Sequence, residues 1–191
     1  LVGGSVRDAL LNVPKSKPDL DLVVPTDAIR LAKLLSDRIG ATCVVLDEER
    51  DIARLVFEGW TIDFAKQIGG SLHEDLCRRD FRMNAIALIL GSNPQIFDPL
   101  NGIKDLRDNI LVAISEENLI DDPLRLLRGL RLISEFNFEL DDQTKLFFQN
   151  HSKLLPKVAH ERIKFEIQRL IRGQWADEVL PVVNQIGLLN P

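Results

Sequence analysis

The stretch Asp19–Val24 reads DLDLVV and decides how the first half of the chain folds. Its apolar end predicts a β-strand, in which residues two apart face the same way about 6.5 Å from each other. Asp19 and Asp21 therefore converge on one face of a sheet. Paired carboxylates hold hard cations, so the strand predicts a metal site for phosphate chemistry. A lone acidic pair at a strand end, however, is more often merely solvated.

A glycine pair precedes this strand. In Leu1–Leu11, LVGGSVRDALL, Gly3 and Gly4 stand between an apolar start and the expected first turn of a helix. Because glycine carries no side chain, the backbone there can approach a ligand closely, and a triphosphate fits against it with Arg7 close by. Taken without the aspartate pair, a plain strand-to-helix turn is the simpler interpretation.

Several segments together carry a family resemblance. Gly3–Asp8 with Asp19–Asp21 resembles the head-domain signature of the class II (bacterial-type) tRNA nucleotidyltransferases and poly(A) polymerases, which include the CCA-adding and CC-adding enzymes. In the family's order there follow Arg78–Ala85, similar to RRDFxxNA, then Asp121–Arg125, similar to EDxxR, and His160–Ile163, similar to its ERI element. The matches extend across nearly the whole chain.

The resemblance implies an α+β fold: a polymerase-β-like nucleotidyltransferase head, with a small mixed sheet and flanking helices, followed by an all-helical neck. The residue pattern agrees, because a helix through Ile39, capped by Thr26-Asp27, precedes expected strands at 42–46, 53–57 and 60–64. We place the boundary near Ser115. Residues 1–114 are then the catalytic head, and residues 115–191 the neck, with base recognition and the start of an RNA-binding region.

The expected chemistry is nucleotidyl transfer with two Mg²⁺ ions about 4 Å apart. Asp19 and Asp21 are the natural bridging ligands. Asp63 falls where family members carry an acidic residue, and it is the candidate for assisting the attacking hydroxyl. By itself, an aspartate at a strand end carries little information.

Asp122 and Arg125 offer an account of base choice. At a spacing of three on one helix they are neighbours, so the carboxylate can accept from an exocyclic amine while the guanidinium donates to the base. Cytosine and adenine present that pattern, and uracil and guanine do not, which predicts the use of CTP and ATP. The plainer alternative makes Asp122 the N-cap of a helix whose first residue is Pro123, with Arg125 in a surface ion pair.

Three further arginines, Arg79, Arg128 and Arg131, match family positions that contact nucleotide. Steps of three drift about 60° around a helix, so Arg131 cannot point where Asp122 does. In the resemblance Asp80 and Asn84 brace the site or touch the ribose. A buried hydrogen-bonding pair is an equal alternative for these last two.

The composition of the chain limits which kinds of partner and which compartment are expected. The 191 residues carry a net charge of −5, which argues against a general nucleic-acid coat. Basic residues nevertheless gather at 151–175, as a phosphate-facing surface or as offsets to acidic neighbours. Two cysteines without CxxC spacing and the lack of a membrane-length apolar run favour the cytoplasm. The first residue is not Met, so we expect a part of a longer protein. Oligomeric state is left open.

The length of the segment 64–77 is relevant to whether the enzyme adds CC or the complete CCA end. Family members that complete CCA carry a longer flexible loop there, and members restricted to CC lack it. The sequence therefore predicts addition of CMP to the tRNA 3′ end from CTP, with AMP from ATP and a CC-only product both left open. The alternatives are a poly(A) polymerase and a non-catalytic nucleotide- or RNA-binding module.

Overall fold

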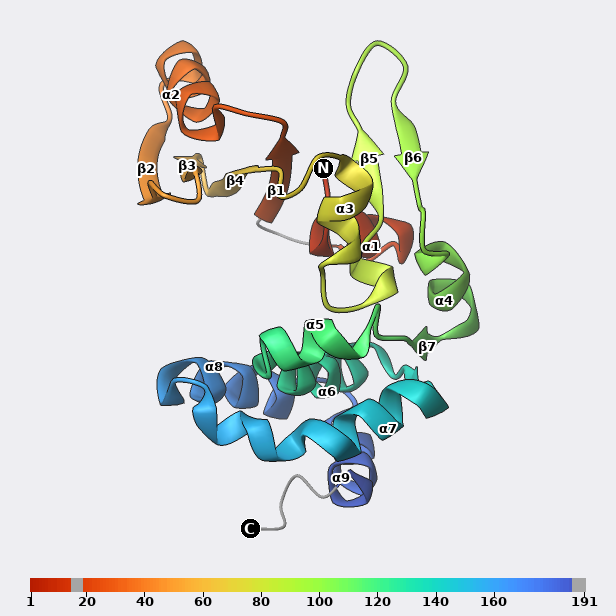
Figure 1. Ribbon diagram of the computed structural model, residues 1–191. Coiled ribbons are helices and arrows are strands. Elements are labelled where there is room, and N and C mark those ends of the chain that lie inside the picture. The colour runs from red at the N-terminus through yellow and green to blue at the C-terminus, as the bar shows by residue number, and fades with distance from the viewer. Residues whose placement is uncertain (15–18, 187–191) are drawn as a thin grey trace. The chain divides into compact units, whose positions relative to one another are not determined.

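The described residues of the computed structural model, 1–14 and 19–186, form two compact units (Figure 1). The first comprises residues 1–78 and 84–100, and the second comprises residues 79–83 and the chain from Asn101 onward. This division lies earlier than the predicted boundary near Ser115. The reason is pairing within the second unit: Ile110 and Leu111 pair with Glu139 and Leu140, and Phe81 bridges Ala113.

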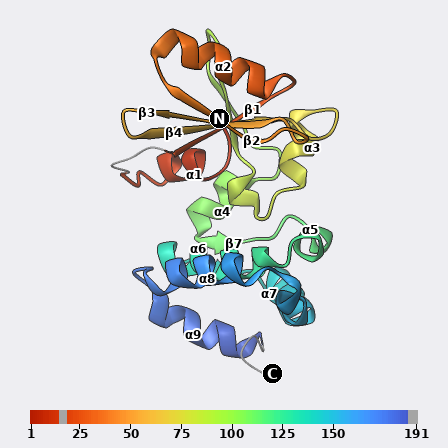
Figure 2. The ribbon, with the colours of Figure 1, turned by 90° about the vertical axis from the view of Figure 1, so that its left-hand side faces the viewer.

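A mixed four-stranded sheet forms the centre of the first unit, in the order β1-β4-β3-β2 (Figure 2). Its strands are β1 (Asp19–Val24), β2 (Thr42–Asp47), β3 (Ile52–Phe57) and β4 (Trp60–Lys66). β1 is parallel to β4, and the other pairs are antiparallel. The remaining elements are α1 (Gly4–Leu10), α2 (Ala28–Ile39), α3 (Leu72–Cys77) and the hairpin of β5 (Ala87–Ile89) and β6 (Gln95–Phe97). The predicted strands and mixed sheet are confirmed.

Helix α2 covers one face of this sheet (Figure 2). The core there consists of Ala28, Ala32, Ala53, Leu55 and Phe64, all buried. Since side chains alternate along a strand, the neighbours of these strand residues face the other way. The face opposite α2 is therefore the one that carries the aspartates of β1.

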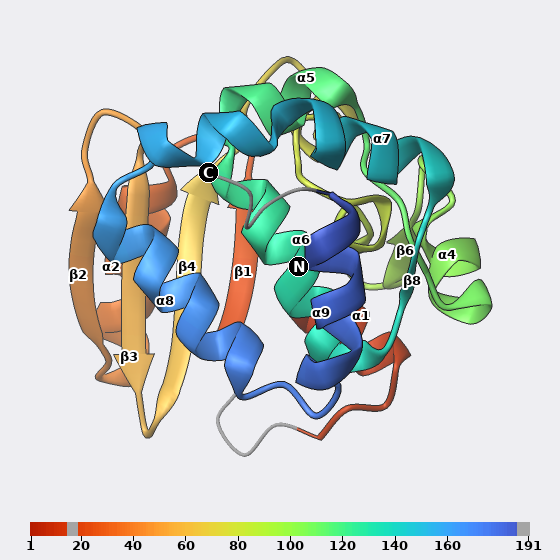
Figure 3. The same cartoon turned by 90° about the horizontal axis from the view of Figure 1, so that it is seen from below.

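The second unit is mostly helical, and α6 packs against both α8 and α9 (Figure 3). Its elements are α4 (Gly102–Asp108), β7 (Ile110–Leu111), α5 (Glu116–Asp121), α6 (Leu124–Phe136), β8 (Glu139–Leu140), α7 (Asp142–His151), the 3₁₀ helix η2 (Ser152–Lys157), α8 (His160–Ile171) and α9 (Ala176–Gln185); a further 3₁₀ turn, η1, spans Arg82–Asn84. Phe81 and Phe148 are fully buried, with ring centroids 6.4 Å apart. Gly129 lets both rings approach α6, because a Cβ there would lie 2.6 Å from the Phe148 ring.

In the described part of the chain, no helix has the length and apolar character of a membrane span.

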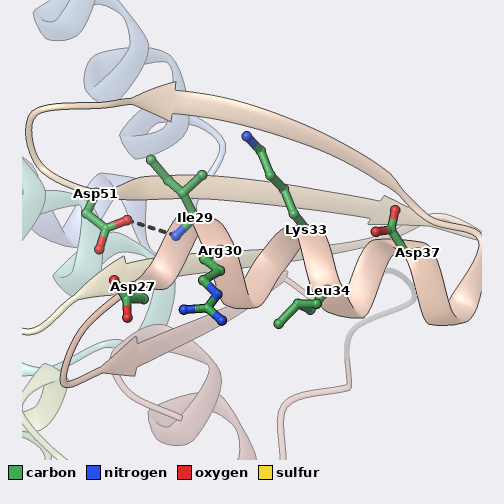
Figure 4. A pocket seen from close by; sticks show the side chains of 7 residues that line it. All are labelled: Asp27, Ile29, Arg30, Lys33, Leu34, Asp37 and Asp51. Carbon is green, nitrogen blue, oxygen red and sulfur yellow. Dashed lines mark hydrogen bonds between the residues drawn. The ribbon is translucent and has the colours of Figure 1, made fainter.

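The cap of α2 comes from another element. Asp27 precedes the helix but makes no side-chain capping bond, which corrects the predicted Thr26-Asp27 cap. Instead Asp51, in the β2–β3 turn, accepts from the backbone N–H groups of Ala28 and Ile29 at 2.9 and 2.8 Å. Figure 4 shows the bond to Ile29. A carboxylate at this end also favours the helix dipole.

We expect Asp51→Asn to lower the free energy of unfolding of the first unit by about 1 kcal/mol, since the charge and one acceptor are lost. The matched control is Asp27→Asn, because both residues have positive φ, 54° in each case, which asparagine tolerates. Urea unfolding followed by circular dichroism measures both. Equal losses in the two variants would contradict the cap across elements.

Candidate active site

Three carboxylates and one guanidinium lie on the sheet face opposite α2. In the register of the sheet Asp21 pairs with Asp63 on β4, and Asp63 pairs with Arg54 on β3. Asp19 lies two residues before Asp21, so it faces the same way. The predicted common face of Asp19 and Asp21 agrees with this register, which also places Asp63 beside Asp21 on the neighbouring strand.

Arg54 is the residue of this face that sequence analysis missed. Its Nε and Nη2 donate to the two carboxylate oxygens of Asp63, each at 2.7 Å. Hydrogen bonding to Asp63 raises the pKa of this guanidinium, and the charges of Asp19 and Asp21 raise it further. The sequence does contain a sign of this residue: Arg54 stands between the apolar residues Ala53 and Leu55 in an expected strand. Because side chains alternate along a strand, Arg54 must face away from the core, on the side that carries the carboxylates.

The donor set of this face fits a magnesium ion. Mg²⁺ is commonly held by one or two carboxylates together with substrate phosphates, and Asp19 and Asp21 supply such carboxylates. Within residues 1–14 and 19–186, no three side chains of His, Cys, Asp or Glu gather into a ready-made metal cluster.

The glycine pair opens α1 as predicted, with Gly3 at φ 71°. Arg7 is turned inward, in contrast to the expected triphosphate contact. It donates to Asp8 through Nε and Nη2 at 2.9 and 2.6 Å and to the Asn84 side-chain oxygen at 2.7 Å. All three residues are buried, so Arg7 orients Asn84 within the first unit.

In the second unit Arg128 binds Asp80. The guanidinium contacts the Asp80 Oδ2 at 3.0 Å, and the other carboxylate oxygen accepts from the Phe81 N–H at 2.8 Å. The charge of Asp80 raises the pKa of Arg128, and those of Glu166 and Asp122 add to the rise. Asp80 thus holds the Arg128 guanidinium in place within the second unit.

Asp122 and Arg125 do not share a helix, which corrects the expected spacing argument. Asp122 ends α5 in an extended conformation, while α6 begins at Leu124 and has Pro123 as N-cap without a side-chain bond. The Asp122 carboxylate is therefore not a cap; it accepts from Nη2 of Arg162, 2.9 Å away on α8.

Arg125 is held by backbone carbonyls. Its Nη1 donates to the carbonyls of Asn118 and Arg79 at 2.9 and 3.3 Å. The Asn118 side chain donates to the same Arg79 carbonyl at 2.8 Å. These bonds fix where the guanidinium lies.

Arg162 is a further residue that sequence reasoning did not assign. It belongs to the HERI segment, and that match is the signal that marks it. A cleft of about 380 Å³ lies beside it, lined by Leu124, Arg128, Glu161, Arg162, Phe165 and Glu166. Arg162 thus connects the Asp122 carboxylate to a polar cleft of the second unit.

Arg131 lies inside the second unit. Its Nε donates to Glu166 at 2.7 Å and its Nη1 to Glu135 at 2.6 Å, and its exposure is 5%. Arg131 therefore ties α6 to α8, a position different from the expected contact with nucleotide. Arg169 also pairs with Glu135, at 3.2 Å, so part of the basic stretch 151–175 offsets acidic neighbours.

Comparison with known proteins places the chain. Residues 1–112 match the poly A polymerase head domain. The chain is 42% identical over 189 residues to a CC-adding tRNA nucleotidyltransferase of Synechocystis sp., covering 99% of this chain and 45% of that protein. It is 34% identical over 187 residues to a CCA-adding enzyme of Streptococcus mutans, covering 91% and 46% respectively. The chain thus spans less than half of these relatives.

A similar solved structure is that of a tRNA nucleotidyltransferase complexed with a primer tRNA and an incoming ATP analog. It matches with a TM-score of 0.87 and 32% identity, over 98% of this chain and 57% of that one. The α+β fold with a polymerase-β-like head is confirmed by this likeness. The chain therefore belongs to the family of tRNA nucleotidyltransferases and poly(A) polymerases, of which it carries the head domain.

Proposed function

We propose that the protein transfers CMP from CTP to the 3′ end of tRNA. The observation that carries this proposal is the alignment of Asp19, Asp21 and Asp63 on one sheet face, opposite α2. The names of the matched relatives support tRNA as the acceptor. A tRNA substrate is consistent with an enzyme that acts in the cytoplasm.

In the reaction, the 3′-hydroxyl oxygen of the tRNA forms a bond to the α-phosphorus of CTP. The bond from that phosphorus to the bridging oxygen breaks, pyrophosphate leaves, and the hydroxyl proton passes to solvent. Two Mg²⁺ ions, when bound, favour the ionised hydroxyl and neutralise the leaving charge. Asp19 and Asp21 would hold these ions, and Asp63 would orient the attacking end.

Base selection falls to Asp122 and Arg125 in this proposal. The carboxylate accepts from the exocyclic amine of cytosine, and Arg125 donates to the ring nitrogen or carbonyl. Uracil would set a carbonyl oxygen against the carboxylate, and unpaired polar groups in a closed site are costly. Arg162 competes for Asp122 until a base arrives, because it donates to Oδ2 in the free protein.

The connection from β4 to α3 favours a CC product. Only residues 67–71 separate the two elements. They are tied down: the Ile68 N–H donates to Asp75 at 3.0 Å, and the Gly70 N–H donates to Glu74 at 2.8 Å. A short, bonded connection leaves no long loop in the place where CCA-completing members carry one.

Product length tests this proposal. With CTP and ATP supplied together, we expect a tRNA that lacks its CCA end to gain two C residues and then stop. Sequencing gels of the labelled tRNA measure the added length. A completed CCA end would contradict the loop argument but keep the family activity, whereas long A-tails on unrelated RNA would favour a poly(A) polymerase. Nucleotide binding without extension would favour the binding module.

A further inference from the structure

The cleft of the second unit has no role in the reaction described so far. Side chains of α6 and α8 line it, and its volume is about 380 Å³. Sites for small molecules range over about 300 to 1,000 Å³, so this cleft lies near the lower end. It therefore has room for a single base with its ribose.

Phe165 is the aromatic residue of this cleft. It is 58% exposed, although it lies in the middle of α8. The Arg169 guanidinium lies over its ring, 5.9 Å from the centroid, and Arg169 is itself bound to Glu135 at 3.2 Å. The ring is thus held in place by its own helix. An exposed aromatic ring can stack against a nucleobase, since every base has a π-face.

The charged side chains of the cleft balance one another. Arg128 and Arg162 line it together with two glutamates, Glu161 and Glu166. Glu166 is 5% exposed and accepts from Nε of Arg131 at 2.7 Å, so its position is fixed. Two cations and two anions offer both donors and acceptors without a net charge. Such a lining suits the polar edges of an uncharged base better than it suits a phosphate group.

The bond from Arg162 to Asp122 places the cleft beside the proposed base-reading pair. Nη2 of Arg162 donates to the Asp122 carboxylate at 2.9 Å, and Asp122 reads the incoming base in the proposed function. Transfer of CMP makes the incoming nucleotide and the last nucleotide of the RNA neighbours in one strand. Neighbouring bases lie about 3.4 Å apart along a strand, so the last base of the RNA must adjoin the base at Asp122.

We propose that the cleft lined by α6 and α8 binds the 3′-terminal base of the acceptor RNA, and that this base stacks on Phe165. The inference rests on the proposed function, which supplies both the RNA end and the incoming nucleotide. It adds a site for the acceptor base next to the site for the incoming base. Because stacking tolerates any base, the cleft can hold the RNA end even as that end changes with each addition.

Two RNA hairpins test the proposal by fluorescence anisotropy with the 191-residue chain. Both carry a fluorescent label and a single-stranded 3′ end without a 3′-hydroxyl, so neither can be extended. One ends in cytidine, and the other has an abasic residue in that place. We expect the parent to bind the cytidine hairpin about tenfold more tightly, as the loss of one stacked base implies.

Variants of Phe165 show whether the ring causes this difference. Phe165→Leu keeps an apolar side chain and removes the ring, so we expect the two hairpins to bind within about twofold of each other. Phe165→Tyr keeps the ring and should restore the difference of about tenfold. An equal difference in the parent and in Phe165→Leu would overturn the proposal. A parent that binds both hairpins alike, or neither of them, would overturn it too.

Ile171→Ala is the matched control. It removes a 66% exposed apolar side chain of the same helix, which is absent from the described lining of the cleft. The difference between the hairpins should persist in this variant. Its loss there as well as in Phe165→Leu would indicate a general apolar contact of α8 with RNA and would overturn the stacking site. Far-ultraviolet circular dichroism of each variant checks that the helices are intact.

Addition of CTP with Mg²⁺ distinguishes the two possible bases. Saturating CTP should leave the difference between the hairpins in place, because the incoming base has its own site. Loss of the difference would show that the incoming base occupies the cleft, and it would overturn the assignment to the RNA end. The proposed function fails separately, when the parent transfers no CMP to a tRNA that lacks its CCA end, since the hairpins report binding alone.

Discussion

Asp19→Asn is expected to lower CMP transfer by about a thousandfold, the equivalent of several kcal/mol of lost transition-state stabilisation. Asparagine keeps the shape of the side chain and removes the charge that holds a divalent ion. Asp21→Asn should have an effect of the same size, because both residues face the same side of β1. Single-turnover incorporation of labelled CTP into tRNA lacking its CCA end measures the rate.

The control for this loss is Asp37→Asn. Asp37 is an exposed aspartate of α2, which covers the opposite face of the sheet. The Asp37→Asn variant should transfer CMP at the same rate as the parent and unfold at the same urea concentration. If the Asp19→Asn variant transfers CMP at a rate within about tenfold of the parent, the aspartate pair does not supply several kcal/mol of transition-state stabilisation.

The second large effect concerns base choice. Asp122→Ala and Arg125→Ala should each reduce the preference for CTP over UTP by about a hundredfold, since hydrogen-bonding sites discriminate strongly against mispaired groups. Mn²⁺ binding should be unchanged, because neither residue belongs to the proposed metal site. Competition between labelled CTP and UTP in the same reaction gives the ratio directly.

Asp121→Ala is the matched control, as the neighbouring carboxylate at the end of α5. It should keep the preference for CTP. If Asp122→Ala and Arg125→Ala both discriminate as well as the parent, base selection lies elsewhere in the protein.

Much of the fold follows from local patterns. The β-rich runs at 42–46, 53–57 and 60–64 and the helix that ends at Ile39 are visible in the sequence, and the structure confirms these elements. Short elements such as α3, α4 and the β7–β8 pair carry too few residues to show a period, so they were not predicted. The unit boundary lies earlier than predicted because Ile110 and Leu111 pair with Glu139 and Leu140, a pairing between distant segments that the sequence does not reveal.

The candidate site could also be predicted only in part from the sequence. Asp19 and Asp21 could be placed on one face because strand alternation is a local rule, whereas the register of β1 with β4, which brings Asp63 beside Asp21, cannot be read from the sequence. Arg7 and Arg131 could not be placed, since their partners Asn84 and Glu166 lie 77 and 35 residues away along the sequence. Contacts across such separations are set by tertiary packing, and a motif match does not reveal whether a guanidinium faces a ligand or the interior.

The most direct test of the central claim is incorporation of labelled CTP into three RNAs of equal length, with Mg²⁺ present. These are a tRNA lacking its CCA end, the same tRNA already ending in CC, and an unrelated RNA. Our account predicts label in the first alone, and none after removal of the divalent ion. Equal labelling of the unrelated RNA, or no labelling by folded protein that binds Mn²⁺, would contradict transfer of CMP to tRNA by this chain.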